Sequence, residues 1–205
     1  FCPFPLPSAF IQGKEAMIGK SEKDFKIEIV PELESSRNKT TILMKLNLEN
    51  NQVVGEASAT ISGLNKSYLL NNLSANNQKE NEIWKKVITA NNLKIQLESQ
   101  ELQKNDYQEQ PSKANFKLKL EDGVKDVNGK LLLKPILLFP LKESLIDIEK
   151  RKFSIENELA YVYEIQYQYE IPSGYKVEFL PENAKTDNEL GSFDIQYKVS
   201  NNSIT

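Results

Sequence analysis

The chain has 205 residues, a formal net charge of −3 and no histidine. A chain of this length forms one large domain or two small ones, and it buries enough surface to fold without disulfides or a structural metal. The slightly acidic balance disfavours nucleic-acid binding, because domains that bind nucleic acids usually carry a basic surplus. The absence of histidine removes the commonest general base and a principal zinc ligand. We therefore expect a folded chain that binds no nucleic acid and needs no cofactor.

The N-terminal residues are rich in proline and are predicted to form an extended connector. Pro3, Pro5 and Pro7 lie close together, and proline fixes φ and donates no backbone hydrogen bond. The sequence does not begin with Met, so we expect it to be a segment of a longer protein. No apolar run is long enough to predict a membrane-spanning helix.

Alternating apolar and polar residues predict several strands before residue 140. The alternating runs are residues 24–31, 41–48, 53–61, 93–97, 116–120 and 131–133. In the first run Phe25, Ile27 and Ile29 share one side, which predicts a half-buried strand. Asn50-Asn51 and Asn128-Gly129 stand between neighbouring runs, and both pairs favour the positive φ of a tight hairpin turn.

Two segments between the strands have helical spacing. Residues 64–73 place Leu64, Tyr68 and Leu69 on one predicted face. Residues 79–90 form a second helix with an apolar stripe, which consists of Ile83, Trp84, Val87 and Ile88.

The last third has the clearest strand pattern. Tyrosine or isoleucine occupies every second position from 161 to 171, and polar or charged residues fill most of the positions between them. Residues 175–179 and 193–199 repeat the alternation. Three consecutive strands with one apolar face each predict an antiparallel sheet laid on a core.

These elements predict a mainly β fold, with antiparallel β-sandwich packing and a short insertion of two helices. We expect a connector at residues 1–22 and a β-sandwich domain at 23–140, with the helical insertion at 64–90. Residues 141–205 are predicted to be a C-terminal antiparallel β module that packs with or against the first domain.

The tyrosine row is the candidate binding surface. Tyr161, Tyr163, Tyr167 and Tyr169 could form a platform on which sugar rings stack, because aromatic faces bind flat apolar surfaces and the hydroxyls add hydrogen bonds. The other interpretation is a sheet face buried in the core, and the matching phase of the two following strands favours it.

For the remaining candidate residues, a structural role is the favoured interpretation. Cys2 is the sole thiol, and no histidine is present to generate a thiolate, so we expect no catalytic residue. Residues 122–129 are similar to an oxygen-rich calcium loop, but Lys125 interrupts them and a hairpin connection is favoured. Carboxylate pairs at a spacing of two are typical of a solvated face, and several glycosylation sequons, Asn38-Lys39-Thr40 among them, match by chance in an Asn-rich chain.

The last third resembles a known module. Residues 171–181, which read IPSGYKVEFLP, together with Gly191-Ser192-Phe193 and Tyr197-Lys198-Val199, resemble the C-terminal β module of secreted transglutaminase-like proteins of Gram-negative bacteria. Residues 46–55 and the helix after Gly63 are also similar to that family. Ser154 stands where the family motif after Arg151 has Pro.

The resemblance implies a non-catalytic C-terminal region of a periplasmic, cell-surface or secreted bacterial protein. The catalytic core of such a protein would lie upstream, so no catalytic residue is carried over to this chain. The implied partners are the upstream domains of the same polypeptide, or a protein or glycan ligand. The alternative hypothesis is a free-standing adhesion or carbohydrate-binding module.

Overall fold

The structure is a computed structural model that describes residues 6–75, 80–89, 92, 94–103, 110–135, 137–138, 152, 159–189, 191–200 and 202–205. Short 3-10 turns occur at Ala9–Ile11 and Ser35–Arg37. The helices and strands, in chain order, are β1 (Glu15–Gly19), β2 (Phe25–Ile29), β3 (Lys39–Glu49), β4 (Gln52–Ile61), α1 (Gly63–Ala75), α2 (Glu80–Thr89), β5 (Ile95–Leu102), β6 (Ser112–Leu120), β7 (Val124–Val127), β8 (Lys130–Leu133), β9 (Val162–Glu170), β10 (Ala184–Asn188), β11 (Gly191–Ile195) and β12 (Ser203–Ile204). The predicted class, a mainly β chain with antiparallel sheets and two short helices, is confirmed.

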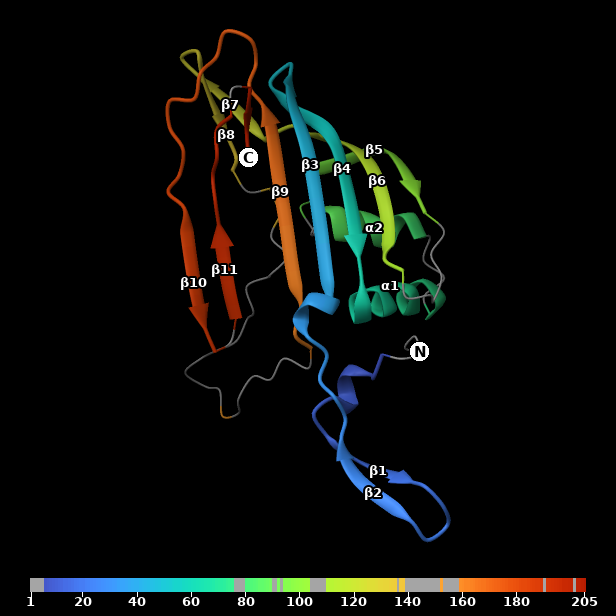
Figure 1. Cartoon of the computed structure of the whole chain (residues 1–205). Helices are drawn as coiled ribbons and strands as arrows, with labels where there is room; N and C mark the ends of the chain where they lie inside the picture. Colours follow the sequence, from blue (N-terminus) through green and yellow to red (C-terminus); the bar gives the residue numbers. More distant parts are fainter. Residues whose placement is uncertain are drawn as a thin grey trace.

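A six-stranded sheet with the order β12-β9-β3-β4-β6-β5 forms the body of the molecule (Figure 1). Every neighbouring pair is antiparallel except β3 and β9, which run parallel from Lys39↔Val162 to Leu46↔Tyr169. The predicted sheet of three consecutive antiparallel strands is therefore wrong. Strand β9 instead aligns its odd-numbered apolar residues with the buried residues of β3, and residues 175–179 form no strand. The division into domains near residue 140 stays a prediction.

Two tight turns fix the register of the hairpins. Asn50 and Asn51 have φ values of 49° and 60°, and they connect the pair Glu49↔Gln52 at the end of β3 and β4. Asn128 and Gly129 have φ values of 54° and 79° between β7 and β8. Positive φ at both central residues matches the right-handed twist of the flanking strands, so both turn predictions are confirmed.

The two helices cover one face of the sheet, and the opposite face is open (Figure 1). Trp84 of α2 is fully buried and packs at a ring-centroid distance of 6.3 Å from Phe116 of β6. The predicted stripe of α2 is confirmed at Ile83, Trp84 and Ile88, but Tyr68 of α1 is 46% exposed and Leu70 is buried instead. No helix in the described part of the chain is long and apolar enough to cross a membrane.

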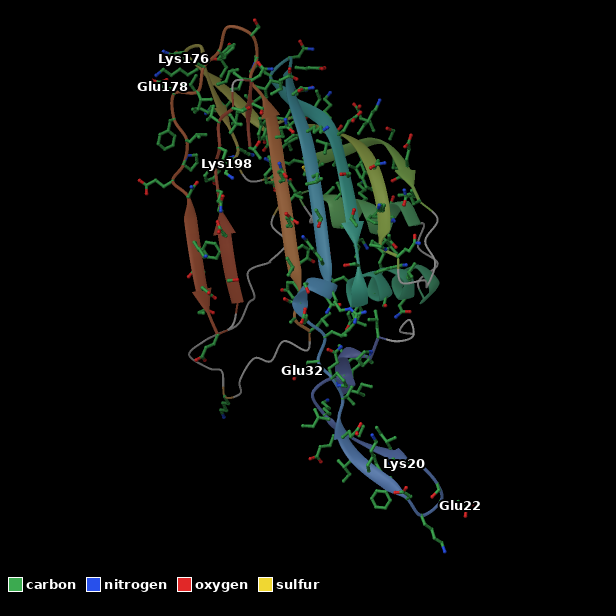
Figure 2. The ribbon with its side chains drawn as sticks, in the orientation of Figure 1. Lys20, Glu22, Glu32, Lys176, Glu178 and Lys198 are labelled. Atoms are coloured by element: carbon green, nitrogen blue, oxygen red, sulfur yellow. The ribbon has the colours of Figure 1, made fainter. Side chains whose placement is uncertain are left out.

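Strands β1 and β2 form a hairpin that projects from the body, hereafter the arm (Figure 1). Figure 2 shows Lys20 and Glu22 at its tip and Glu32 at its base. The strand predicted at residues 24–31 is present as β2, but the prediction that its apolar face is half-buried is wrong. Met17, Phe25, Ile27 and Ile29 share one face of the arm and are 61–73% exposed.

The segment after β9 is also poorly covered. None of the described residues between 171 and 205 is buried. Tyr175, Phe179, Phe193 and Val199 are 46–81% exposed. Strands β10 and β11 form a separate two-stranded antiparallel sheet, which is drawn to the left of β9 in Figure 1. An isolated hairpin is marginally stable in water, so this segment has a weaker apolar core than the central sheet.

The buried side chain of Asn38 joins three elements at one end of the sheet. Its Nδ2 donates to the carbonyl of Ala160 at 3.1 Å, and its Oδ1 accepts from the backbone N–H of Leu64 at 2.8 Å. The backbone carbonyl of Asn38 accepts from Val162 N at 3.0 Å. Asn38 is 0% exposed. Its Oδ1 provides a hydrogen-bond acceptor for the backbone N–H of Leu64, which has no partner within the first turn of α1. This burial also means that the sequon at Asn38 is not accessible in the folded chain.

We predict that Asn38→Ala lowers the free energy of unfolding by about 2–4 kcal/mol. The truncation leaves the Leu64 N–H buried without a partner, which costs roughly 1–3 kcal/mol, and it removes the hydrogen bond to the carbonyl of Ala160, which is worth about 1 kcal/mol. Urea denaturation followed by circular dichroism measures the change. Asn115→Ala on the exposed face of β6 is the control and should change stability by less than about 0.5 kcal/mol. Equal effects of the two substitutions would contradict the role of Asn38.

Candidate functional site

The tyrosine row of β9 passes from the surface into the core. Tyr161 and Tyr163, at the start of the strand, are 40% and 44% exposed, whereas Tyr169 near its end is only 4% exposed. Tyr167 is partly buried against the core. The rings of Tyr161 and Tyr163 contact each other edge to face, with centroids 5.4 Å apart. The four tyrosines therefore form no single surface, and only the Tyr161–Tyr163 pair is available to a ligand.

Tyr167 and Tyr169 hold the chain that follows β8. The hydroxyl of Tyr169 donates to the carbonyl of Lys134 at 3.0 Å, and the hydroxyl of Tyr167 accepts from Leu138 N at 3.0 Å. Burial raises the pKa of both phenols above the ordinary value, more strongly at Tyr169. These two tyrosines act as packed supports that position Leu137 and Leu138 in the core. The interpretation of the row as a buried face thus holds for Tyr169 and is wrong for Tyr161 and Tyr163.

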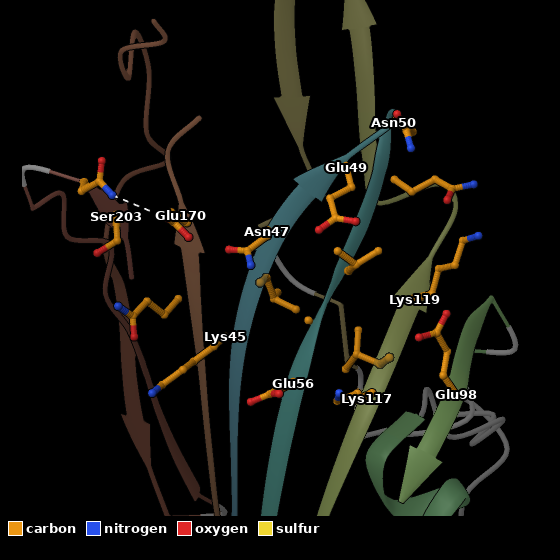
Figure 3. A pocket seen from close by; sticks show the side chains of 17 residues that line it. Lys45, Asn47, Glu49, Asn50, Glu56, Glu98, Lys117, Lys119, Glu170 and Ser203 are labelled. Carbon is orange, nitrogen blue, oxygen red and sulfur yellow. Dashed lines mark hydrogen bonds between the residues drawn. The ribbon is translucent and has the colours of Figure 1, made fainter. Parts of the chain in front are cut away.

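The open face of the sheet carries a broad polar groove of about 790 Å³ (Figure 3). It crosses β9, β3, β4, β6 and the start of β12, and it continues onto β5. Its polar lining residues on β3 and β6 alternate with core residues along each of these strands. The charged side chains in the lining are Lys45, Glu49, Glu56, Glu98, Lys117, Lys119 and Glu170.

Charges of opposite sign occupy neighbouring strands across the groove. Lys45 of β3 lies opposite Glu56 of β4, which lies opposite Lys117 of β6. At one end of the groove, Asn202 donates to one carboxylate oxygen of Glu170 at 3.3 Å. Asn47 donates to the other oxygen at 2.9 Å when its amide takes the orientation that satisfies both of its polar atoms. These contacts fix the Glu170 carboxylate next to β12. The groove presents donors and acceptors together, which suits a polar ligand of mixed character better than a simple anion or cation.

Gly55 lets β3 and β4 approach each other beneath the groove. A Cβ atom at Gly55 would lie 2.0 Å from the backbone oxygen of Lys45 and 3.0 Å from Cα of Leu46. Both contacts involve backbone, so a side chain there would force the strands apart. Glycine inside a strand commonly marks such a close approach, and here it allows the pairing of Gly55 with Leu46.

The other sequence candidates have structural roles or lie outside the described residues. Asp122 forms ion pairs with Lys94 and with Lys134, the latter at 2.9 Å, and the Lys134 and Lys94 ammonium groups hold the pKa of Asp122 below its ordinary value. Asp126 accepts from Gly129 N at 2.9 Å inside the β7–β8 turn, so the hairpin interpretation of residues 122–129 is confirmed.

Cys2 lies outside the described residues. Within the described residues no group of three or more His, Cys, Asp or Glu side chains could hold a metal ion.

Sequence reasoning missed both the groove and the arm. The polar residues of the groove occupy every second position of β3, β4 and β6, and the sequence shows them as the polar side of each alternating run. Alternation alone does not show which strands are neighbours, so the groove itself could not be predicted. For the arm, residues 15–19 show no alternation of apolar residues that would have predicted β1. Only the pairing of Met17 with Ile27 brings the exposed apolar residues together.

Comparison with protein families matches residues 129–205 to a domain of unknown function with a solved structure, DUF3858. The matched region runs from the β7–β8 turn to β12 and covers less than half of the chain. Neither the curated proteins nor the solved structures give a match to this chain. The match supports a domain of unknown function in the C-terminal part, and its description names no activity, substrate or partner.

We predict that alkaline pH destabilises the fold through the buried phenols. Because the folded-state pKa of Tyr169 is raised, its stabilising contribution is complete below the ordinary pKa of about 10 and is lost as pH rises above it. The loss reaches up to about 1.4 kcal/mol per pH unit for one such group. Tyr169→Phe should cost about 1 kcal/mol at neutral pH, through the lost bond to Lys134, yet show a shallower decline above pH ~10.

Chemical denaturation at a series of pH values between ~8 and ~11 measures this decline. Tyr161→Phe, at an exposed ring, is the matched control and should leave the slope unchanged. A Tyr169→Phe slope identical to that of the parent chain would contradict the prediction.

Proposed function

We propose that this chain is a non-catalytic β region of a transglutaminase-like cell-envelope or secreted bacterial protein. In this proposal the chain supports the catalytic-type core of the same polypeptide, and the apolar face of the arm is the contact surface. The region itself carries out no acyl transfer or peptide hydrolysis. Its location would be the periplasm, the cell surface or the medium.

The apolar face of the arm is the observation that supports this role most directly. Met17, Phe25, Ile27 and Ile29 line one side of a two-stranded sheet, all more than half exposed. A contiguous exposed apolar patch is rare on a monomeric protein and marks an interaction surface. A two-stranded hairpin also needs packing to be stable. A folded domain covering this face would satisfy both requirements.

The identity of the occupant rests on the resemblance described above, which implies a transglutaminase-like core upstream of this region. The family match at residues 129–205 is compatible with an accessory module and adds no evidence for the core. The absence of histidine supports a non-catalytic role for the chain itself, because the sole thiol, Cys2, has no histidine base within it. Interfaces between domains of one polypeptide typically bury about 600–1,500 Å².

The test uses the upstream part of the parent protein, expressed separately and mixed with this chain in a calorimetric titration. We expect association, and we expect Ile27→Asp to weaken it at least about tenfold, because a charge would enter an apolar contact. Lys26→Ala is the matched control, since Lys26 lies on the opposite face of the same strand and pairs with Glu28. Absence of association, or equal effects of the two substitutions, would overturn the proposal.

A second candidate function is carbohydrate binding, which the exposed Tyr161–Tyr163 pair supports. Two rings in edge-to-face contact at the surface provide an aromatic face and two hydroxyls for a sugar. On this hypothesis, binding to a glycan array would be lost in Tyr163→Ala with little change in stability. Tyr175→Ala, which removes another half-exposed tyrosine outside the pair, is the control. An array without binding by the parent chain would remove this candidate.

A further inference from the structure

The β7–β8 hairpin carries the sole Asn-Gly pair of the sequence at its tip, Asn128-Gly129. Both residues are exposed. A Cβ atom built at Gly129 would meet no atom of the described residues within 4 Å, so the space around the tip is open. Figure 1 shows the hairpin at the end of the molecule opposite the arm. Water therefore reaches the Asn128 side chain and the peptide bond that follows it.

An asparagine that precedes a glycine can react with its own backbone. The nitrogen of Gly129 attacks Cγ of Asn128, and the new N–Cγ bond closes a succinimide ring. The side-chain nitrogen of Asn128 leaves as ammonia, which takes the proton of the Gly129 N–H. Water then opens the ring: cleavage at the main-chain carbonyl gives isoaspartate, and cleavage at Cγ gives aspartate. Glycine favours the attack because it places no Cβ beside the reacting nitrogen.

The folded turn holds the attacking nitrogen back. Gly129 N donates to Oδ1 of Asp126 at 2.9 Å. The carboxylate disfavours loss of the amide proton, because a negative charge disfavours the formation of a second one beside it. A carboxylate is also too weak a base to remove the proton of a peptide amide, so it restrains the nitrogen and does not activate it. Attack on Cγ therefore requires this hydrogen bond to break and the turn to open.

Opening of this hairpin costs little. β7 and β8 pair only with each other and join no other described strand. Among the residues of the two strands only Val124 is buried, while Leu131 and Leu133 pack partly against the core. An isolated two-stranded hairpin is marginally stable, and such segments open locally far more often than a whole domain unfolds. The bond between Gly129 and Asp126 is therefore a substantial part of what keeps the turn closed.

Isoaspartate at position 128 would disturb the pairing of β7 with β8. It routes the backbone through the side chain and adds a methylene group to it, so Val127 and Lys130 would no longer face each other across a tight turn. Lys130 also pairs with the carboxylate of Glu178 at 2.8 Å, in the segment after β9. The change at the tip would thus reach the contact between the hairpin and the C-terminal segment.

We propose that Asn128 is a modification site, at which the chain forms isoaspartate without an enzyme, and that Asp126 sets the rate by holding the Gly129 N–H. The reaction needs only water, and it involves neither the arm nor an upstream domain. The inference is therefore independent of the proposed function.

The Asn50-Asn51 turn provides an internal contrast. Its two residues have positive φ, as Asn128 and Gly129 do. The residues that follow each asparagine, Asn51 and Gln52, carry side chains that hinder the attacking nitrogen. The turn also joins β3 and β4, which are interior strands of the six-stranded sheet. We expect this turn to stay unmodified while Asn128 converts.

The site is tested by incubating the purified chain at mildly alkaline pH and mapping its peptides by mass spectrometry with fragmentation that distinguishes isoaspartate. The same chain in urea gives the rate without the folded turn. We expect isoaspartate at Asn128 in the folded chain, more slowly than in urea, and none in Asn128→Gly, which keeps residues suited to a tight turn. No conversion in the folded chain while the chain in urea converts completely would overturn the site. Equal rates with and without urea would overturn the restraint by the turn.

The role of Asp126 is tested by two substitutions. Asp126→Ala should speed conversion about three- to tenfold, the factor that a hydrogen bond of ordinary net strength is worth. Asp126→Asn, which keeps an acceptor oxygen without the charge, should give an intermediate rate, while amide exchange across the hairpin shows that β7 and β8 stay paired. Lys125→Ala, at another exposed position of β7, is the matched control and should leave the rate unchanged.

Two results would overturn the role of Asp126. One is conversion in Asp126→Ala at or below the rate of the parent chain. The other is equal acceleration by Lys125→Ala, which would assign the effect to a weakened hairpin instead of the hydrogen bond to Gly129.

Discussion

The buried amide of Asn38 is the contact on which the arrangement of the chain depends. It receives the N–H of Leu64, donates to the carbonyl of Ala160, and lies where β3 begins. A buried amide without partners is costly, so the folded state is favoured when α1 and the start of β9 both reach this point. Gly63 begins α1 with a φ of +64°, which glycine adopts readily. A Cβ at this position would also collide with Arg37 and Asn38, so glycine is required at the turn into α1. One side chain thus sets where a helix and a distant strand enter the sheet.

The register of β9 follows from that entry point. With Val162 held at Asn38, the odd-numbered residues of β9 fall level with the buried residues of β3, and the even-numbered residues join the open polar face. The depth of burial then depends on what lies above each residue. Tyr169 is covered at Lys134, to which its hydroxyl donates, whereas Tyr163 has no comparable cover among the described residues and is 44% exposed. A single repeating pattern therefore gives core support at one end of the strand and an accessible aromatic pair at the other.

The central sheet and its helices form a self-contained core, while the periphery does not. Trp84, Leu118 and Leu120 are essentially inaccessible to solvent, as in any well-packed domain interior. The arm and the segment after β9 instead keep large apolar side chains in water. Burying one such side chain is worth roughly 1.5–3 kcal/mol, so both regions gain substantially from a covering surface. The two regions differ in kind, because the arm gathers its apolar side chains on one face, whereas those after β9 are spread over β11 and the segments on either side of the β10–β11 hairpin.

The sequence by itself determined the local elements. The Asn50-Asn51 and Asn128-Gly129 turns follow from the preference of these residues for positive φ, and the helix at Ile83–Ile88 follows from its apolar stripe. The alternation in β9 identified a strand with one apolar face. These features depend on neighbours within a few residues, and the chain carries that information directly.

Only the tertiary structure decided which strands became neighbours and which apolar faces were covered. The parallel pairing of β9 with β3 joins residues that are more than a hundred positions apart, and no periodicity encodes that choice. The apolar face at Phe25 and Ile27 has the same pattern as a buried strand, yet the structure leaves it in solvent. A hydrophobic pattern shows that a face must be covered, but it does not show whether the cover comes from the same chain or from a partner. The polar groove is decided in the same way, because its residues come together only through the order of the strands.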